Sequence, residues 1–139
     1  MPADENKALV RRAWEAFAGQ EGLDRLAAFY AADYVAHRTD GETSGWAANR
    51  RYMEAVFAAF PDLRVTVEDL VAEGDRVVSR VTLRGTHRGE LYGIAPTGTA
   101  VAFVGTNVAR VEGGKIAEEW ELYDDLGLLR QLGALPGPE

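Results

Sequence analysis

The sequence predicts an α+β fold in which N-terminal helices lie on one face of a curved, mainly antiparallel sheet. Apolar residues recur at helical spacing as far as Phe60, and from Leu63 onward they alternate with polar ones. Pro61 separates the two halves, because proline cannot continue a helix. Helices followed by antiparallel strands are typical of this fold class. The 139 residues fit one domain, 1–139, and a sheet bent around its helices can leave a cavity between the layers.

Three helices are predicted before Pro61. Each has an apolar stripe, and glycines bracket the end of the first. They cover residues 6–20, 23–34 and 46–60.

The second half predicts four strands and a last short helix. Gly113-Gly114 between the last two strands is a strong signal for a two-residue hairpin. The strands cover residues 63–73, 76–87, 99–112 and 115–124, and the helix covers residues 125–133 before a Pro-rich tail, 134–139.

Composition excludes several function classes. A net charge of −7 and scattered basic residues argue against nucleic acid as a partner. Without cysteine there are no disulfides or thiolate ligands, and two histidines far apart in sequence disfavour a metal site. The polar start "MPADENK" is unlike a signal peptide, and no apolar run approaches the roughly 18 residues of a membrane span. We therefore expect a cytoplasmic protein without a membrane partner.

Motifs for bound cofactors are missing as well. "GTHRGELYG" is neither a P-loop nor a dinucleotide fingerprint, and no nucleophile elbow is present. No cofactor is expected, and two chemistries are left: proton transfer in an apolar cavity, or ligand binding.

The acidic stretch "EEWELYDD" contains the main candidates. In a strand, Glu119, Glu121 and Tyr123 share one face, and Glu118, Trp120 and Leu122 share the other. Glu119 and Glu121 are either surface acids or buried carboxylates whose raised pKa suits acid–base work. We expect Glu118, Asp124 and Asp125 to be solvated, with Asp124 or Asp125 capping the last helix.

Other polar residues lie on predicted apolar faces. His87 shares the parity of Leu83, Val81 and Val77 and therefore points inward, as a structural histidine or a site residue. His37 is expected to be a surface histidine. Asn49, on the stripe of the third helix, either bonds to backbone or faces a ligand. The large side chains that form core, pocket wall or both are Trp14, Phe17, Tyr30, Trp46, Met53, Phe57 and Phe103.

Two segments resemble a known family. "GTHRGELYGIAPTG", within residues 61–98, and "GGKIAEEWELYDDLGLLRQLG", within residues 104–136, are similar to SnoaL-like polyketide cyclases, the ester cyclase group of the nuclear transport factor 2-like superfamily. The resemblance implies a homodimer of cone-shaped subunits, each with a deep apolar pocket for a hydrophobic small molecule such as a polyketide ester, and no cofactor. It also implies ring closure by intramolecular aldol condensation, with a pocket carboxylate as base and acid.

The resemblance places that carboxylate at Glu121, where the characterised cyclases have Asp. They also tend to have His where Glu119 stands. The family's other two histidines correspond to His87 and His37, which raises the expectation that both belong to the pocket. The leading hypothesis makes Glu121 the general base and acid and lets His87 hydrogen-bond the developing oxyanion.

Two alternatives remain open. The first is a related isomerase, dehydratase or hydrolase in the same pocket. Epoxide hydrolysis on this fold resembles a paired-Asp-plus-Arg arrangement, and the sequence offers no inward Arg to complete it. The second is a small-molecule binder or dimeric interaction module without catalysis.

Overall fold

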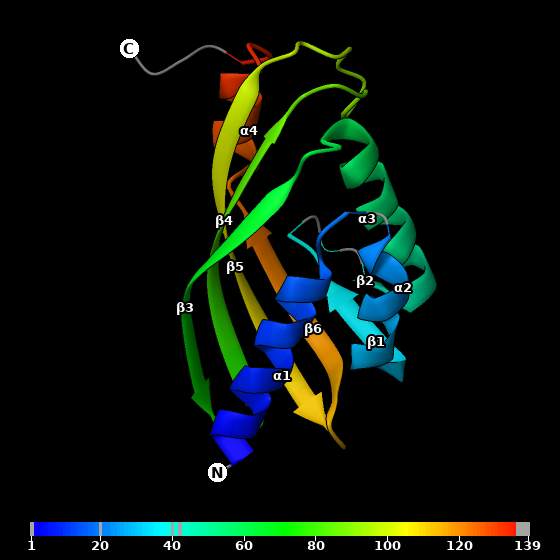
Figure 1. Ribbon diagram of the computed structural model, residues 1–139, viewed down its shortest axis with the longest axis vertical. Coiled ribbons are helices and arrows are strands. Elements are labelled where there is room, and N and C mark those ends of the chain that lie inside the picture. Colours follow the sequence, from blue (N-terminus) through cyan, green and yellow to red (C-terminus); the bar gives the residue numbers. More distant parts are fainter. Residues whose placement is uncertain (1, 20, 40, 42, 136–139) are drawn as a thin grey trace.

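The sheet is strongly twisted, and the helices lie along one of its faces (Figure 1). The computed structural model describes residues 2–19, 21–39, 41 and 43–135. This arrangement confirms the predicted α+β class. The helices are α1 (Pro2–Ala16), α2 (Gly22–Leu26), a 3₁₀ helix η1 (Ala27–Phe29), α3 (Trp46–Ala59) and α4 (Asp125–Gln131). The strands are β1 (Tyr30–His37), β2 (Thr43–Ser44), β3 (Arg64–Glu73), β4 (Arg76–Thr86), β5 (Ala100–Glu112) and β6 (Lys115–Tyr123).

The strands of the described residues form one sheet in the order β2-β1-β6-β5-β4-β3. All neighbours are antiparallel except β1 and β6, which run parallel. β5 and β6 meet at Gly113 and Gly114, whose φ angles of 58° and 75° suit a tight hairpin turn that other residues rarely adopt. The predicted hairpin is therefore confirmed.

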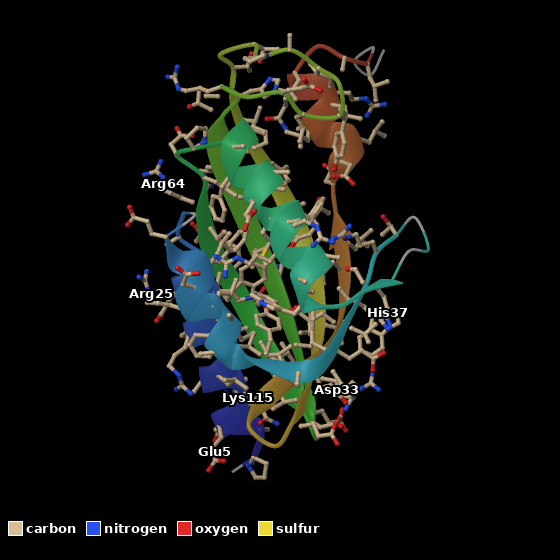
Figure 2. All side chains as sticks on the ribbon, turned by 90° about the vertical axis from the view of Figure 1, so that its right-hand side faces the viewer. Glu5, Arg25, Asp33, His37, Arg64 and Lys115 are labelled. Carbon is tan, nitrogen blue, oxygen red and sulfur yellow. The ribbon has the colours of Figure 1, made fainter. Side chains whose placement is uncertain are left out.

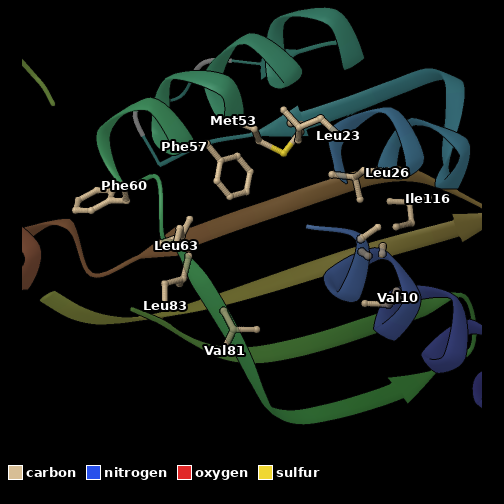
Figure 3. Close-up of a cluster of buried hydrophobic side chains, with 14 of the residues drawn as sticks. Val10, Leu23, Leu26, Met53, Phe57, Phe60, Leu63, Val81, Leu83 and Ile116 are labelled. Atoms are coloured by element: carbon tan, nitrogen blue, oxygen red, sulfur yellow. The ribbon is translucent and has the colours of Figure 1, made fainter. Parts of the chain in front are cut away.

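The core lies between the helices and the inner face of the sheet. α1 packs on β3 and β4, α3 on β1, and α4 on β5. Figure 3 shows Met53 and Phe57 of α3 directed toward the sheet, opposite Val81 and Leu83 of β4. Val81 is 0% and Leu83 4% exposed, as the alternation along this strand predicts.

The predicted helix over residues 23–34 is wrong in its second half. Helical structure ends at Phe29, and β1 begins at Tyr30. From there the chain pairs with β6, which starts more than eighty residues later, and Tyr34 and Ala36 alternate inward. Partners so distant in sequence override the helical stripe that the local pattern suggests.

The ends of the first helix also differ from the prediction. α1 begins at Pro2, with Asp4 and Glu5 in its first turn, where acidic side chains favour the helix dipole. It ends at Ala16; the predicted last residue, Gln20, lies outside the described residues, as do residues 136–139 of the predicted tail. Within the described ranges, no helix is long and apolar enough to cross a membrane.

Candidate active site

A cavity opens between the inner face of the sheet and the helices α1 and α3. The empty space in and around it, with the solvent at its open mouth counted, is about 840 Å³. Most of its wall is apolar or aromatic, with a few polar groups, as small-molecule sites usually are. The polar residues in the wall are Asn49, Asn107, Glu119, Glu121 and Asp125, with the tyrosines Tyr30, Tyr52, Tyr92 and Tyr123.

Strand β6 places two carboxylates in this wall. Glu119 and Glu121 both line the cavity, two positions apart on the inner face, whereas Leu122 is 61% exposed on the other face. The alternation in the sequence predicts that these residues lie on two faces, and the structure shows that the face with Glu119 and Glu121 is the inner one. The bulk of the cavity wall is apolar, so both acids are held in a poorly hydrated space.

Glu119 is fixed by hydrogen bonds on both carboxylate oxygens. It is 6% exposed; Tyr34 donates to Oε1 at 2.6 Å and Asn107 Nδ2 donates to Oε2 at 2.9 Å. Burial raises the pKa of Glu119, while the bonds from Tyr34, Asn107 and Tyr30 act to lower that pKa. This carboxyl group is therefore the better anion of the two.

Glu121 has a different environment. Among the described residues, none donates a hydrogen bond to its carboxyl group. Burial first, and then the charge of Glu119, raise the pKa of Glu121 from 4.5 to about 8, against the opposing effect of Arg38. Such a group can give and take a proton near neutral pH.

Tyrosines surround this carboxyl pair as neutral donors. Burial, together with the two glutamates, holds the pKa values of Tyr30 and Tyr123 well above the usual range. The Tyr123 ring lies across Gly105 on β5, so close that a Cβ at Gly105 would collide with it. Gly105 thus lets the Tyr123 ring lie flat against the sheet beside Glu121.

One side of the cavity is formed by Tyr52, Tyr92 and Asp125. Tyr92 is 58% exposed with a φ of 50°, which is unusual for a residue other than glycine. Burial and a hydrogen bond with Tyr92 raise the pKa of Tyr52. The prediction that Asp125 is solvated is wrong, because Asp125 lines the cavity and burial raises its pKa. The cap of α4 is Asp124, whose Oδ1 accepts from the Gly127 N–H at 2.9 Å.

His87 is buried but lies behind the cavity wall. Its ring stands 5.7 Å from that of Phe60, which does line the cavity, and His87 is not among the lining residues. Nδ1 accepts from the Thr97 backbone N–H at 3.2 Å, which places the imidazole proton on Nε2. Nε2 is buried with no partner among the described residues. The inward direction predicted for His87 is confirmed, but its hydrogen bonds are with the loop that follows β4.

His37 lies on the opposite face of the sheet from the cavity. Its Nε2 is 2.6 Å from Glu118 Oε2, and its ring stacks on Trp120 with centroids 5.1 Å apart. Figure 2 shows His37 near the end of β1, at the periphery of the molecule. The pocket position that the resemblance implies for His37 is therefore incorrect, and the surface position predicted from the sequence pattern is right.

Arg38, the next residue, is the inward cation that the sequence interpretation missed. Its Nη2 donates to Asn49 Oδ1 at 3.3 Å, and its guanidinium lies 4.0 Å from the centre of the Tyr52 ring. Tyr34 and Ala36 share one parity on β1, and Arg38, one residue past the end of the strand, continues that parity. Assigning residues 30–34 to a helix concealed this pattern; a strand assignment would have pointed both Tyr34 and Arg38 inward.

The remaining predicted pocket residues fall into two groups. Trp46 and Phe57 stand behind the wall: Trp46 stacks on Tyr30, and Phe57 packs against Phe17. Asn107 was not predicted, although its inward parity on β5 was available from the sequence. The predicted residues that line the cavity are Trp14, Phe17, Tyr30, Asn49, Met53, Phe103, Glu119, Glu121 and Tyr123. Within the described residues, no three His, Cys, Asp or Glu side chains are grouped so that they could hold a metal ion.

The chain is similar to a family of polyketide cyclases and to several solved structures. A family model described as SnoaL-like polyketide cyclase matches residues 8–132. The structure of AclR, a candidate hydroxylase from Streptomyces galilaeus, is 32% identical with a TM-score of 0.90, over 99% of this chain and 86% of that one. IdmH, a candidate polyketide cyclase from Streptomyces antibioticus, is 31% identical with a TM-score of 0.82, over 92% and 98%. No match was found among curated proteins.

Proposed function

The chain belongs to the SnoaL-like polyketide cyclase family, and from this premise we propose that it closes a ring in a hydrophobic, carbonyl-bearing substrate by intramolecular aldol condensation. Glu121 is the general base and acid, and no cofactor takes part. The observation that supports this most directly is the environment of Glu121: a carboxyl group in an apolar cavity whose pKa lies at about 8.

The proposed reaction cycle needs one proton and no other reactant. Ionised Glu121 removes a proton from the carbon next to a substrate carbonyl, leaving an enolate. The enolate carbon attacks a second carbonyl of the same molecule, so that a carbon–carbon bond forms and that oxygen becomes an alkoxide. Protonated Glu121 then returns its proton to the alkoxide.

The negative oxygen of these intermediates needs a hydrogen-bond donor in the cavity. Since His87 lies behind Phe60, we assign this role to Tyr123 rather than to the histidine. Tyr123 shares the inner face of β6 with Glu121, and its raised pKa keeps the hydroxyl protonated throughout the physiological range.

Replacing Glu121 by Gln tests the proposal. Turnover is followed with a synthetic aryl diketone ester that can close a ring by aldol condensation. We expect a loss of about 100-fold or more in kcat, because an amide cannot exchange the proton. Circular dichroism checks folding, and Glu118→Gln on the outer face is the matched control. Unchanged turnover in folded Glu121→Gln would remove Glu121 from the mechanism, and binding without turnover in the wild type would support a non-catalytic module instead.

A second candidate is a hydrolase that activates water in the same cavity. Arg38 favours it, because an inward cation now stands near the carboxyl pair, and paired carboxylates with an arginine suit water activation better than ring closure. Turnover in ¹⁸O-labelled water separates the two. A hydrolase incorporates the label into a newly formed hydroxyl group, whereas aldol closure adds no solvent oxygen beyond what carbonyl exchange in an enzyme-free control accounts for.

We further propose that the outer face of the sheet joins two copies of the chain. Val71, Val78, Val108 and Trp120 are register partners from strand to strand and form a continuous apolar row. Exposed apolar surface of this kind is usually covered. We expect a dimer in sedimentation velocity at micromolar concentration. Leu122 is exposed on the same outer face as Trp120, and we expect Leu122→Lys to be a monomer. A wild-type monomer would contradict the proposal.

A further inference from the structure

Hydrogen bonds run in one direction from Arg38 to Glu119. A guanidinium can only donate, so the oxygen of Asn49 faces Arg38, at 3.3 Å from Nη2. Asn49 Nδ2 therefore points to Tyr34 and donates to its hydroxyl oxygen at 3.1 Å. That leaves the Tyr34 proton for Glu119 Oε1, 2.6 Å away. The cation at one end fixes the direction of every bond and favours a carboxylate, not an acid, at the other end.

Asn107 completes this arrangement on the second oxygen of Glu119. An ionised carboxylate only accepts, so Asn107 presents its Nδ2 to Oε2, at 2.9 Å. Its Oδ1 must then turn away from Glu119. Asn107 is 2% exposed, and this oxygen is buried without a hydrogen-bond partner among the described residues. A buried acceptor without a donor is costly, and such a position in a cavity wall suggests that a donor is supplied there.

Glu121 is placed to supply that donor. Asn107 and Glu121 are register partners across β5 and β6, and both line the cavity. Opposite residues on one face of an antiparallel pair have Cβ atoms about 4.5–5.5 Å apart, within reach of two side chains of this length. Only the protonated form of Glu121 carries a hydrogen that Asn107 Oδ1 can accept.

We propose that Asn107 is a positioning residue that keeps the single proton of the carboxyl pair on Glu121. One side of its amide donates to ionised Glu119, and the other accepts from the acid hydroxyl of Glu121. This proposal rests on the proposed role of Glu121 as the acid–base residue. When Glu121 gives up its proton, Asn107 Oδ1 loses its donor, which favours recovery of a proton from the substrate and makes Glu121 a stronger base.

The other groups that face Glu121 do not exchange its proton. Burial is the main cause that raises the pKa values of the nearby tyrosines, which therefore stay neutral: Tyr30, Tyr34, Tyr52 and Tyr123. The charge of Arg38 favours ionised Glu121, and that of Glu119 opposes it. Asp125, from α4, is a further acid in the wall and is titrated alongside as an internal reference.

The proposal is tested by a carboxyl ¹³C NMR titration of the ligand-free protein with labelled glutamate and aspartate. Glu119→Gln and Glu121→Gln assign the two signals. In the wild type we expect Glu119 to ionise at lower pH than Glu121. In Asn107→Leu we expect the pKa of Glu121 to fall by about one pH unit or more, because its acid form loses an acceptor while Glu119 loses a donor. The pH at which kcat/KM rises should fall with it.

Two further variants make the outcome specific. Thr106→Val, the adjacent residue on the opposite face of β5, should leave both titrations unchanged. Tyr34→Phe, which removes the other donor to Glu119, should shift the proton in the same direction as Asn107→Leu and serves if that variant does not fold. The proposal is overturned if wild-type Glu121 ionises before Glu119, or if Asn107→Leu leaves both titrations unchanged. Because the titration needs no substrate, these outcomes are separate from the loss or survival of turnover in Glu121→Gln.

Discussion

Glu118 and Glu121 belong to the same strand, but they lie on opposite faces of the sheet and their pKa values move in opposite directions. On the outer face, hydrogen bonds with His37 and Arg110 lower the pKa of Glu118. On the inner face, burial and the charge of Glu119 raise the pKa of Glu121 to about 8. The residue type is identical, so the difference comes from what each face meets: the Arg110 cation, a hydrogen-bonding histidine and water outside, an apolar cavity inside.

The same contrast applies to the two faces of the whole sheet. The inner face carries the core, the cavity and a hydrogen-bond network whose polarity is fixed by Arg38. The outer face carries surface ion pairs and an apolar row around Trp120, with Arg76 lying 4.9 Å over its ring. The chemistry that we propose therefore depends on one face, and the association that we propose depends on the other.

The largest effect expected of a single substitution at fixed pH distinguishes the faces through two adjacent valines. Val77 is 0% and Val78 36% exposed on β4. Val77→Ala should lower the free energy of unfolding by about 2–3 kcal/mol, because it removes buried methyl groups and leaves a cavity. Val78→Ala should lower it by less than about 0.5 kcal/mol. Urea unfolding at submicromolar concentration measures both, and equal losses would show that the faces do not differ in packing.

The second effect is the pH dependence of stability due to Glu121. Its pKa is about 8 in the folded chain against 4.5 ordinarily, so between these values the folded state binds more protons than the unfolded state. Stability should therefore fall as pH rises through this window, by up to about 1.4 kcal/mol for each pH unit. Thermal unfolding from pH 5 to pH 8 measures this slope. Glu121→Gln should flatten it, and an equal slope in that variant would assign the effect to other groups.

The smallest effect has the opposite sign and comes from Glu118. Its lowered pKa means that its contribution to stability is present above pH 4.5 and is lost as pH falls through the folded value. Since the group is near the surface, the effect is small and should weaken with added salt. Unfolding of Glu118→Gln between pH 3 and pH 6 tests this. A loss of stability that grows with acidity, relative to wild type, would contradict it.

The sequence by itself determined the strands after Pro61, the hairpin at Gly113-Gly114 and the shared face of Glu119, Glu121 and Tyr123. These features follow from alternation and turn chemistry, which are local and repeat along each strand. Alternation also directed His87 inward, but it could not decide whether an inward residue reaches the cavity or stands behind another side chain, as His87 does behind Phe60.

Only the tertiary structure decided that Tyr34 and Arg38 point inward, and which side chains Asn107 contacts. β1 exists as a strand because it pairs in parallel with β6, and no local pattern encodes a partner so far along the chain. That pairing brings Tyr34 to Glu119 and aligns Arg38 with the network that ends there. The sequence thus supplied the two carboxylates, and the long-range pairing gave them different surroundings, because hydrogen-bond donors and burial, not residue type, set the pKa of each.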